Sequence, residues 1–253
     1  MPDLTSQITL GFAVDSEARF ENFLPGSNSD ALFELQDFIS KPDSGLIYLW
    51  GSVGSGCSHL LQAATHESRS LDHNAVYLPA EELLDSPTSV LENLQDLDLV
   101  CIDNFDKIAG DPEWETAIFH LYNRLAAQNA KMVVGALAPP REQTIKLSDL
   151  KTRLQSGLTL RLDLLNDYEK MEVLQYRAQL RGMELPEKVA HYILAHSSRE
   201  MRFLIDLLGQ LDAEGLRVKK KKLTIPVVKN VLESIAQPAS EADSDPQFLS
   251  PSS

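Results

Sequence analysis

Short apolar runs alternate with amphipathic stretches from residue 46 to residue 162. Each run holds four to six residues rich in branched or aromatic side chains, which is typical of a buried strand. We expect strands at 46–50, 75–78, 97–102, 131–136 and 158–162, and helices at 58–64, from 80 onward and at 112–129. This alternation predicts a parallel sheet with helices on both faces.

The pattern changes after about Leu162, where strand-like runs give way to helical spacing. Asn166 is a favourable N-cap and Glu169 lies three residues later, which predicts a capping box at the start of a helix that ends at Gly182. Three more helices are expected at 186–196, 199–214 and 224–235, with Gly215 ending the second of them and Thr224 capping the last. A small all-helical domain therefore follows the α/β domain.

The two ends of the chain carry neither pattern. Residues 1–19 have no helical period and little apolar content, so we expect a mobile arm. Residues 237–253 combine proline, serine and acidic residues, a composition that favours disorder. The expected organisation is an arm at 1–19, an α/β domain at 20–162, a helical domain at 163–236 and a disordered tail at 237–253.

Composition narrows the class of protein. Lys and Arg number 23 against 37 Asp and Glu in 253 residues, and the net charge of −14 argues against a protein that binds DNA over its whole surface. Residues 219–222 are four lysines, which form either a solvated turn or a contact for phosphate or for a partner.

The sequence also carries signals of the compartment. Two cysteines are too few for the disulfide framework of a small secreted protein. No apolar stretch approaches the ~20 residues that span a bilayer, and the N-terminus lacks a signal pattern, so we expect a soluble cytoplasmic protein.

A glycine-rich loop separates the first predicted strand from the first predicted helix. It has the frame Gly-x-x-x-x-Gly-Lys-Ser/Thr, with a cysteine in place of the lysine. Such glycines let backbone N–H groups turn toward phosphate oxygens, and the helix N-terminus adds a favourable dipole. An ordinary strand-to-helix turn is the alternative. The predicted phosphate-binding residues are Gly51, Ser52, Val53, Gly54, Ser55, Gly56, Cys57, Ser58 and His59.

Cys57 and Asn104 bear on hydrolysis. A thiol cannot supply the positive charge that a loop lysine places on the β- and γ-phosphates, so we expect weak triphosphate binding and poor hydrolysis, with a smaller loss for a diphosphate. Asp103 ends the third predicted strand, where P-loop ATPases hold Mg²⁺, and Ser58 takes the other metal-ligand position; Asp103 simply starting a turn is the alternative. Asn104 follows Asp103, at the position where a working ATPase usually carries a second acid that positions water. An amide cannot act as that base.

Three further features are ambiguous when each is taken alone. Arg153 precedes the fifth predicted strand and Arg199 opens the third helix of the helical domain, and most arginines are surface residues. Gln7, Leu10 and Phe12 lie in the predicted arm, in a segment that suits extended binding in a partner's groove. A chance polar and apolar mixture or a short edge strand would explain the same segment.

Together these residues resemble the AAA+ ATPases, which join a P-loop α/β domain to a helical lid. More narrowly, residues 20–235 are similar to the ATPase part of the bacterial initiator DnaA, and the pattern ends after the lid, without the helix-turn-helix domain of DnaA. This combination resembles the Hda family of DnaA-homologous regulators. The resemblance rests on residues 20–28, 49–50, 58–61, 99–104, 117–124, 199–201 and 223–226.

The resemblance implies a negative regulator of replication initiation. Such proteins bind the DNA-loaded sliding clamp, the β subunit of DNA polymerase III, and promote hydrolysis of DnaA-bound ATP to give inactive ADP-DnaA. It implies that Gln7, Leu10 and Phe12 bind the clamp. It also implies that Arg153 is an arginine finger acting in trans on DnaA, and that Arg199 is a sensor-2 arginine on the chain's own nucleotide.

The same resemblance implies bound ADP, with Mg²⁺ at Ser58 and Asp103. Cys57, Asn104 and Leu137, the last where a polar sensor-1 residue is expected, each remove a part needed for hydrolysis in cis, so we expect no intrinsic ATPase and weak ADP binding. A self-sufficient AAA+ ATPase such as a helicase loader is the alternative, and it would need those parts. We expect no strong direct DNA binding and no membrane contact. Self-association stays open.

Overall fold

The structure is a computed structural model that describes residues 14–94, 96–218 and 222–236. The chain divides into two compact units, Met1–Leu165 and Asn166–Ser253. Among the described residues, no helix combines the length and the apolar character needed to cross a bilayer.

The first unit contains a five-stranded, all-parallel sheet with the strand order β2-β3-β4-β1-β5. All five strands lie where the apolar runs predict them. Because the strands are parallel, the carboxyl ends of β3, β4 and β1 lie next to one another at one edge of the sheet. The strands are β1 (Gly45–Gly51), β2 (Ala75–Pro79), β3 (Leu99–Asp103), β4 (Lys131–Ala136) and β5 (Leu158–Leu162).

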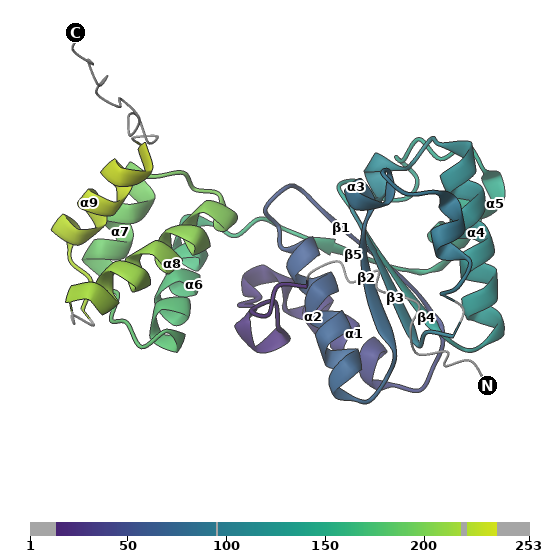
Figure 1. The fold of residues 1–253 in the computed structure, drawn as a ribbon, viewed down its shortest axis with the longest axis horizontal. Helices are drawn as coiled ribbons and strands as arrows, with labels where there is room; N and C mark the ends of the chain where they lie inside the picture. The colour runs from purple at the N-terminus through teal and green to yellow at the C-terminus, as the bar shows by residue number, and fades with distance from the viewer. Residues whose placement is uncertain (1–13, 95, 219–221, 237–253) are drawn as a thin grey trace, which may run out of the picture. The chain divides into compact units, whose positions relative to one another are not determined.

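Helices cover both faces of this sheet, with α1 and α2 on one face and α4 and α5 on the other (Figure 1). Successive residues of β1 point to opposite faces: Ile47 and Leu49 pack with α1 and α2, whereas Leu46 and Tyr48 pack with α4 and α5. The predicted α/β fold is therefore confirmed. The helices are α1 (Ser29–Ser40), α2 (Cys57–Ser70), α3 (Ala80–Leu83), α4 (Pro112–Ala127) and α5 (Ser148–Ser156), with short 3-10 turns η2 (Phe20–Asn22), η3 (Gly26–Asn28), η4 (Thr88–Leu91) and η5 (Phe105–Lys107).

Two of these helices, α1 and α5, are absent from the sequence-based prediction. The helix α5 is mostly polar and buries only Leu150 and Leu154, four residues apart. Two apolar positions are too few to define a helical stripe in the sequence. This omission matters because α5 carries Arg153, which was expected to lie in a connection before the fifth strand.

Residues 14–19 correct the predicted extent of the mobile arm. The backbone N–H of Asp15 donates to Gln62 Oε1 at 2.8 Å, and rings on α2 contact backbone carbonyls of this segment: His66 Nε2 lies 3.0 Å from Asp15 O, and His59 Nε2 lies 3.0 Å from Arg19 O. Ala18 is buried. The segment is held by hydrogen bonds from side chains 40 to 51 residues away, which no local pattern reveals.

The second unit is helical: α6 (Asp167–Leu180), α7 (Glu187–His196), α8 (Met201–Val218) and α9 (Ile225–Ala236). The capping box at Asn166 and Glu169 is confirmed, with reciprocal bonds of 3.0 and 2.7 Å, and Gly182 follows α6 with φ +72°. Gly215 does not end α8. A glycine costs a helix about 1 kcal/mol, and the burial of Leu204, Leu207, Leu208 and Leu211 along α8 outweighs it.

Candidate phosphate loop and adjoining strand ends

The loop between β1 and α2 needs its glycines. Gly54 and Gly56 have φ of +86° and +100°, a region that side chains disfavour. A Cβ at Gly51 would lie 2.5 Å from Ser55 Oγ and 2.6 Å from Leu162 O. The Ser55 N–H donates to Ser52 O at 2.9 Å, which tightens the turn. The chain therefore turns sharply from a buried strand into the N-terminus of a 14-residue helix, where unpaired N–H groups favour anions.

The segment before α1 packs against this loop. A Cβ at Gly56 would lie 2.7 Å from Phe23 Cε2, and the rings of Phe23 and His59 have centroids 5.6 Å apart. His59 also contacts the Arg19 carbonyl, so in this structure it holds the preceding segment rather than facing open solvent. Phe23 was part of the resemblance to DnaA but was not predicted as a site residue.

Cys57 is a neutral thiol in this environment. Its Sγ lies 3.5 Å from Ser55 Oγ. The pKa of the Cys57 thiol is raised to about 12, chiefly by burial and to a lesser extent by the negative charges of Asp103 and Asp106, against a lowering contribution from the Ser55 hydrogen bond. At neutral pH the side chain therefore carries no charge, neither the positive charge of a loop lysine nor the negative charge of a thiolate.

Asp103 ends β3 and is buried. Tyr77 on β2 donates its hydroxyl to Asp103 Oδ2 at 2.6 Å, and the Asn104 N–H donates to Oδ1 at 2.9 Å. Burial and the Asp103 charge raise the pKa of Tyr77 well above its usual range, so the phenol stays a donor. A Cβ at Gly135 on β4 would come within 2.9 Å of Oδ1, so this glycine gives the carboxylate its room.

This carboxylate keeps some capacity for a cation. Each of its oxygens has a second lone pair, and Mg²⁺ commonly binds through one or two carboxylates with water completing its shell. Asp103 therefore has oxygen donors of the kind that Mg²⁺ prefers. Among the described residues, no three His, Cys, Asp or Glu side chains gather as a metal cage of their own.

The residues after β3 and β4 are engaged within the protein. Asn104 has φ +53° and donates its Nδ2 to Glu81 Oε2 at 3.1 Å. Asp106 accepts the Leu137 N–H at 2.7 Å, which fixes the turn after β4, and the Leu137 side chain is exposed. An amide and an alkyl group thus follow β3 and β4, and neither can activate water.

Arg153 and Arg199, the two arginines predicted as site residues, lie in different units of the chain. Arg153 is on the last turn of α5, on the face of the sheet opposite α2, so the structure does not bring it to the loop of its own chain (Figure 1). Arg199 lies in the turn just before α8 rather than in its first turn, and its Nη1 pairs with Asp167 Oδ2 at 2.9 Å. Both side chains of that pair are more than half exposed.

Other predicted residues fall outside the described part of the chain. These are the proposed clamp-binding residues Gln7, Leu10 and Phe12, the tail at 237–253 and three of the four consecutive lysines. The fourth, Lys222, pairs with Glu184, the residue that it faces in an isolated β-bridge.

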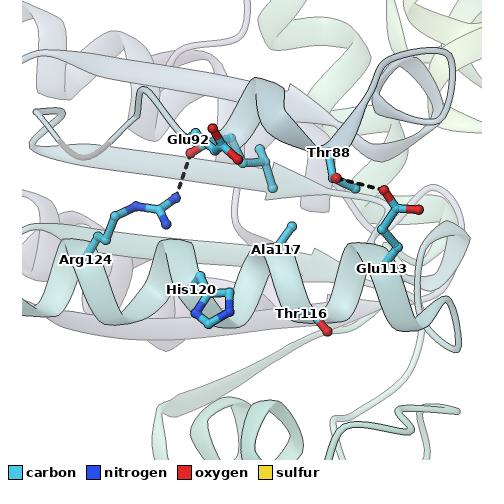
Figure 2. Close-up of a pocket in the computed structure, with 8 residues that line it drawn as sticks. Thr88, Glu92, Glu113, Thr116, Ala117, His120 and Arg124 are labelled. Carbon is cyan, nitrogen blue, oxygen red and sulfur yellow. Dashed lines mark hydrogen bonds between the residues drawn. The ribbon is translucent and has the colours of Figure 1, made fainter.

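A cavity of about 390 Å³ lies between η4 and α4, and Figure 2 shows its lining. Arg124 Nη2 donates to Leu91 O at 2.9 Å across it, and Thr88 Oγ1 donates to Glu113 Oε1 at 3.0 Å. None of the predicted site residues lines this cavity. Sequence reasoning missed it because its walls come from two segments without a motif.

Comparison with known proteins assigns the family. Residues 14–161 match the bacterial DnaA ATPase domain, which is more than half of the chain, and residues 167–232 match the Hda lid domain. Domain III of the Thermotoga maritima replication initiation protein DnaA superposes with a TM-score of 0.74 at 20% identity, covering 89% of this chain and 100% of that one. AMPPCP-bound DnaA from Aquifex aeolicus gives 0.71 at 18% identity, covering 88% and 71%.

The wider AAA+ fold also matches. The Thermotoga maritima RuvB Holliday junction branch migration motor gives a TM-score of 0.59 at 18% identity, over 80% of this chain and 68% of that one. Likeness at this identity concerns the fold alone, whereas the two family matches cover both units of the chain. The chain therefore belongs to the Hda-type, DnaA-homologous AAA+ proteins, which have a nucleotide-binding fold and regulate replication initiation.

Proposed function

We propose that this protein is a negative regulator that binds the sliding clamp on DNA and promotes hydrolysis of DnaA-bound ATP in trans, leaving ADP-DnaA. The observation that carries the proposal is a division of parts. The chain's own phosphate loop has lost its charge, while an exposed arginine is presented on the opposite face of the sheet, with α5 as its support. Such a chain is suited to complete a partner's site rather than its own.

Hydrolysis in cis lacks its usual chemical parts. Cys57 is neutral, so no cation from the loop stabilises the γ-phosphate, and the Asn104 amide donates to Glu81 instead of accepting a proton from water. The self-sufficient ATPase, such as a helicase loader, requires both parts. We therefore expect no intrinsic hydrolysis.

Hydrolysis in trans needs only a well-placed cation from this chain. A guanidinium that reaches a transferring phosphoryl group stabilises the negative charge that develops on it, which is worth about 10³–10⁵ in rate in other nucleotide hydrolases. Arg153 is exposed and carries that group. DnaA supplies the ATP, the metal and the water-positioning residues in this account.

We also propose that the loop binds ADP weakly. Backbone N–H groups of the loop and the N-terminus of α2 would hold the two phosphates, and Ser58 and Asp103 would hold a hydrated Mg²⁺. Arg199 is the proposed sensor-2 residue, and it would exchange its exposed partner Asp167 for the nucleotide. A diphosphate tolerates the missing charge because it has no γ-phosphate.

For the clamp, we propose that Gln7, Leu10 and Phe12 bind as an extended segment. The amide would fix the register in a groove, and the two apolar side chains would fill pockets there. The segment precedes the part of the chain that is held against α2, which begins near Asp15. Clamp binding would thus be separable from the folded domain.

The test is hydrolysis of DnaA-bound ATP in the presence of clamp-loaded DNA. Arg153→Ala should abolish the stimulation and leave clamp pull-down intact, and replacing Gln7, Leu10 and Phe12 by alanine should abolish pull-down. Arg141→Ala is the matched control, because Arg141 is also an exposed arginine of the first unit and, within the described residues, its ion-pair partner is its sequence neighbour Glu142 alone. Stimulation that survives Arg153→Ala would refute the finger assignment.

A further inference from the structure

The guanidinium of Arg153 is held by an aromatic ring. Its Cζ lies 5.7 Å from the centroid of Tyr122, which is half-buried on α4. Within the described residues, no carboxylate lies within ion-pair distance of Arg153. Two other arginines differ: Arg161 lies over Trp50 but also pairs with Asp163 at 2.7 Å, and Arg199 pairs with Asp167.

This difference has a chemical consequence. A carboxylate would hold the guanidinium in place but would occupy its N–H donors and offset its charge. An aromatic face attracts the same cation through its quadrupole and accepts no conventional hydrogen bond. The Tyr122 ring therefore restricts where Arg153 points and leaves its N–H donors and its charge for another anion.

The backbone that carries Arg153 is also fixed relative to Tyr122. Leu150 and Leu154 are fully buried in the core that includes α4. At the start of α5, the buried carboxylate of Glu115 on α4 accepts the N–H groups of Lys146 and Leu147, at 2.7 to 3.1 Å. The helix α5 is thus attached to α4 at its start and along its buried side.

We propose that Tyr122 is a positioning residue that holds Arg153 ready for a phosphate-bearing partner. The inference rests on the proposed function, because it assumes that Arg153 is the group that acts. A free arginine side chain samples many rotamers, and ordering it on contact with the partner costs conformational entropy. Ring contact before docking removes part of that cost, and because a finger arginine interacts most strongly with the charge that develops in the transition state, the gain should appear in the rate of the stimulated step rather than in docking.

The experiment compares Tyr122→Leu, which removes the ring, with Tyr122→Phe, which keeps it, and uses Arg153→Ala as the reference. The stimulated hydrolysis of DnaA-bound ATP is measured at increasing concentrations of each variant. Tyr122→Leu should lower the maximal rate about three- to tenfold, the range that a partly exposed cation–π contact supplies. Its half-saturating concentration should stay within twofold of the unchanged protein, and Tyr122→Phe should restore the maximal rate.

A second readout needs no partner and guards against misfolding. In the isolated protein, the ring current of Tyr122 should shift the Arg153 Nε–H resonance upfield. The shift should persist in Tyr122→Phe and vanish in Tyr122→Leu while the backbone amide resonances far from position 122 keep their positions. A resonance at the same frequency in all three proteins would overturn the inference directly.

The kinetic results distinguish a failure of the proposed role of Arg153 from a failure of the proposed role of Tyr122. No loss in Arg153→Ala would refute the proposed finger itself. Loss in Arg153→Ala with a normal rate in Tyr122→Leu would leave the finger standing and overturn the role of Tyr122. A raised half-saturating concentration at an unchanged maximal rate would make Tyr122 a docking residue instead. A Tyr122→Phe variant as slow as Tyr122→Leu would assign the effect to the hydroxyl, which also contradicts the inference.

Discussion

Cys57→Lys should raise the affinity of this chain for nucleotide. The loop already has the geometry of a phosphate cradle, with its glycines in conformations that only glycine adopts readily, and it leads into the N-terminus of α2. It lacks a charge, because the Cys57 thiol, with a pKa of about 12, is neutral at physiological pH. The substitution would supply the charge that the proposed phosphate site lacks.

The size of the effect follows from what an ammonium adds. A hydrogen bond to a charged group contributes about 1.5–3 kcal/mol. The introduced ammonium would also lie near Asp103 and Asp106, whose charges act on position 57, and this competition keeps the gain near the lower end. About 1.5–2 kcal/mol corresponds to roughly ten- to thirtyfold in the dissociation constant.

Isothermal titration calorimetry with ADP and Mg²⁺ measures this directly. Cys57→Ser is the matched control: it keeps a neutral side chain of similar size and should leave the affinity within twofold of the unchanged protein. A fold difference below two between Cys57→Lys and Cys57→Ser, with both variants folded, would show that this loop does not hold the phosphates. The account of the neutral loop would then be wrong.

Three further predictions concern stability. Glu115→Ala should lower the free energy of unfolding, measured by urea denaturation, by about 3–5 kcal/mol. The reason is that the substitution leaves the N–H groups of Gly110, Lys146 and Leu147 without their acceptor. A change in the m-value with an unchanged free energy of unfolding would contradict this prediction. Gly56→Ala should lower the melting temperature, through its φ of +100° and contact with Phe23, and Phe23→Ala in the same chain should recover part of the loss. Stability should fall as pH rises above about 9, where unfolded thiols ionise and the buried ones, with pKa near 12, do not; substituting both cysteines should flatten this slope.

The fold was largely predictable because the strands β1 to β4 are buried along nearly their whole length and stand out as apolar runs, whereas β5 buries only Leu160 and Leu162, on alternate positions. The runs at 131–136 and 158–162 coincide with β4 and β5. The capping box was also predictable, because its two residues, Asn166 and Glu169, lie only three positions apart in the sequence. The helix α5 was not predictable in this way. It is stabilised by Leu150, Leu154 and a buried glutamate on another helix, contacts that leave too weak a trace in the sequence.

The candidate site shows the same limit. Glycine spacing predicted the loop and the end of β3 predicted Asp103, because both signals are local. The side chains that contact Asp103 and the loop come from distant segments of the sequence. Tyr77 donates to Asp103 from 26 residues away, and Phe23 packs on Gly56. Glu115 is a further case, since a glutamate on an amphipathic helix is normally a surface residue and here is fully buried. Side-chain partners of this kind depend on the tertiary structure.

The most direct test of the central claim is an omission assay of ATP hydrolysis by DnaA, with this protein, the sliding clamp and DNA each left out in turn. The account predicts hydrolysis that requires all of them and none from this chain alone. Stimulation that is lost in Arg153→Ala and kept in Arg141→Ala would complete that result. Hydrolysis by this chain in the absence of DnaA, or no stimulation by a folded, clamp-bound protein, would contradict it.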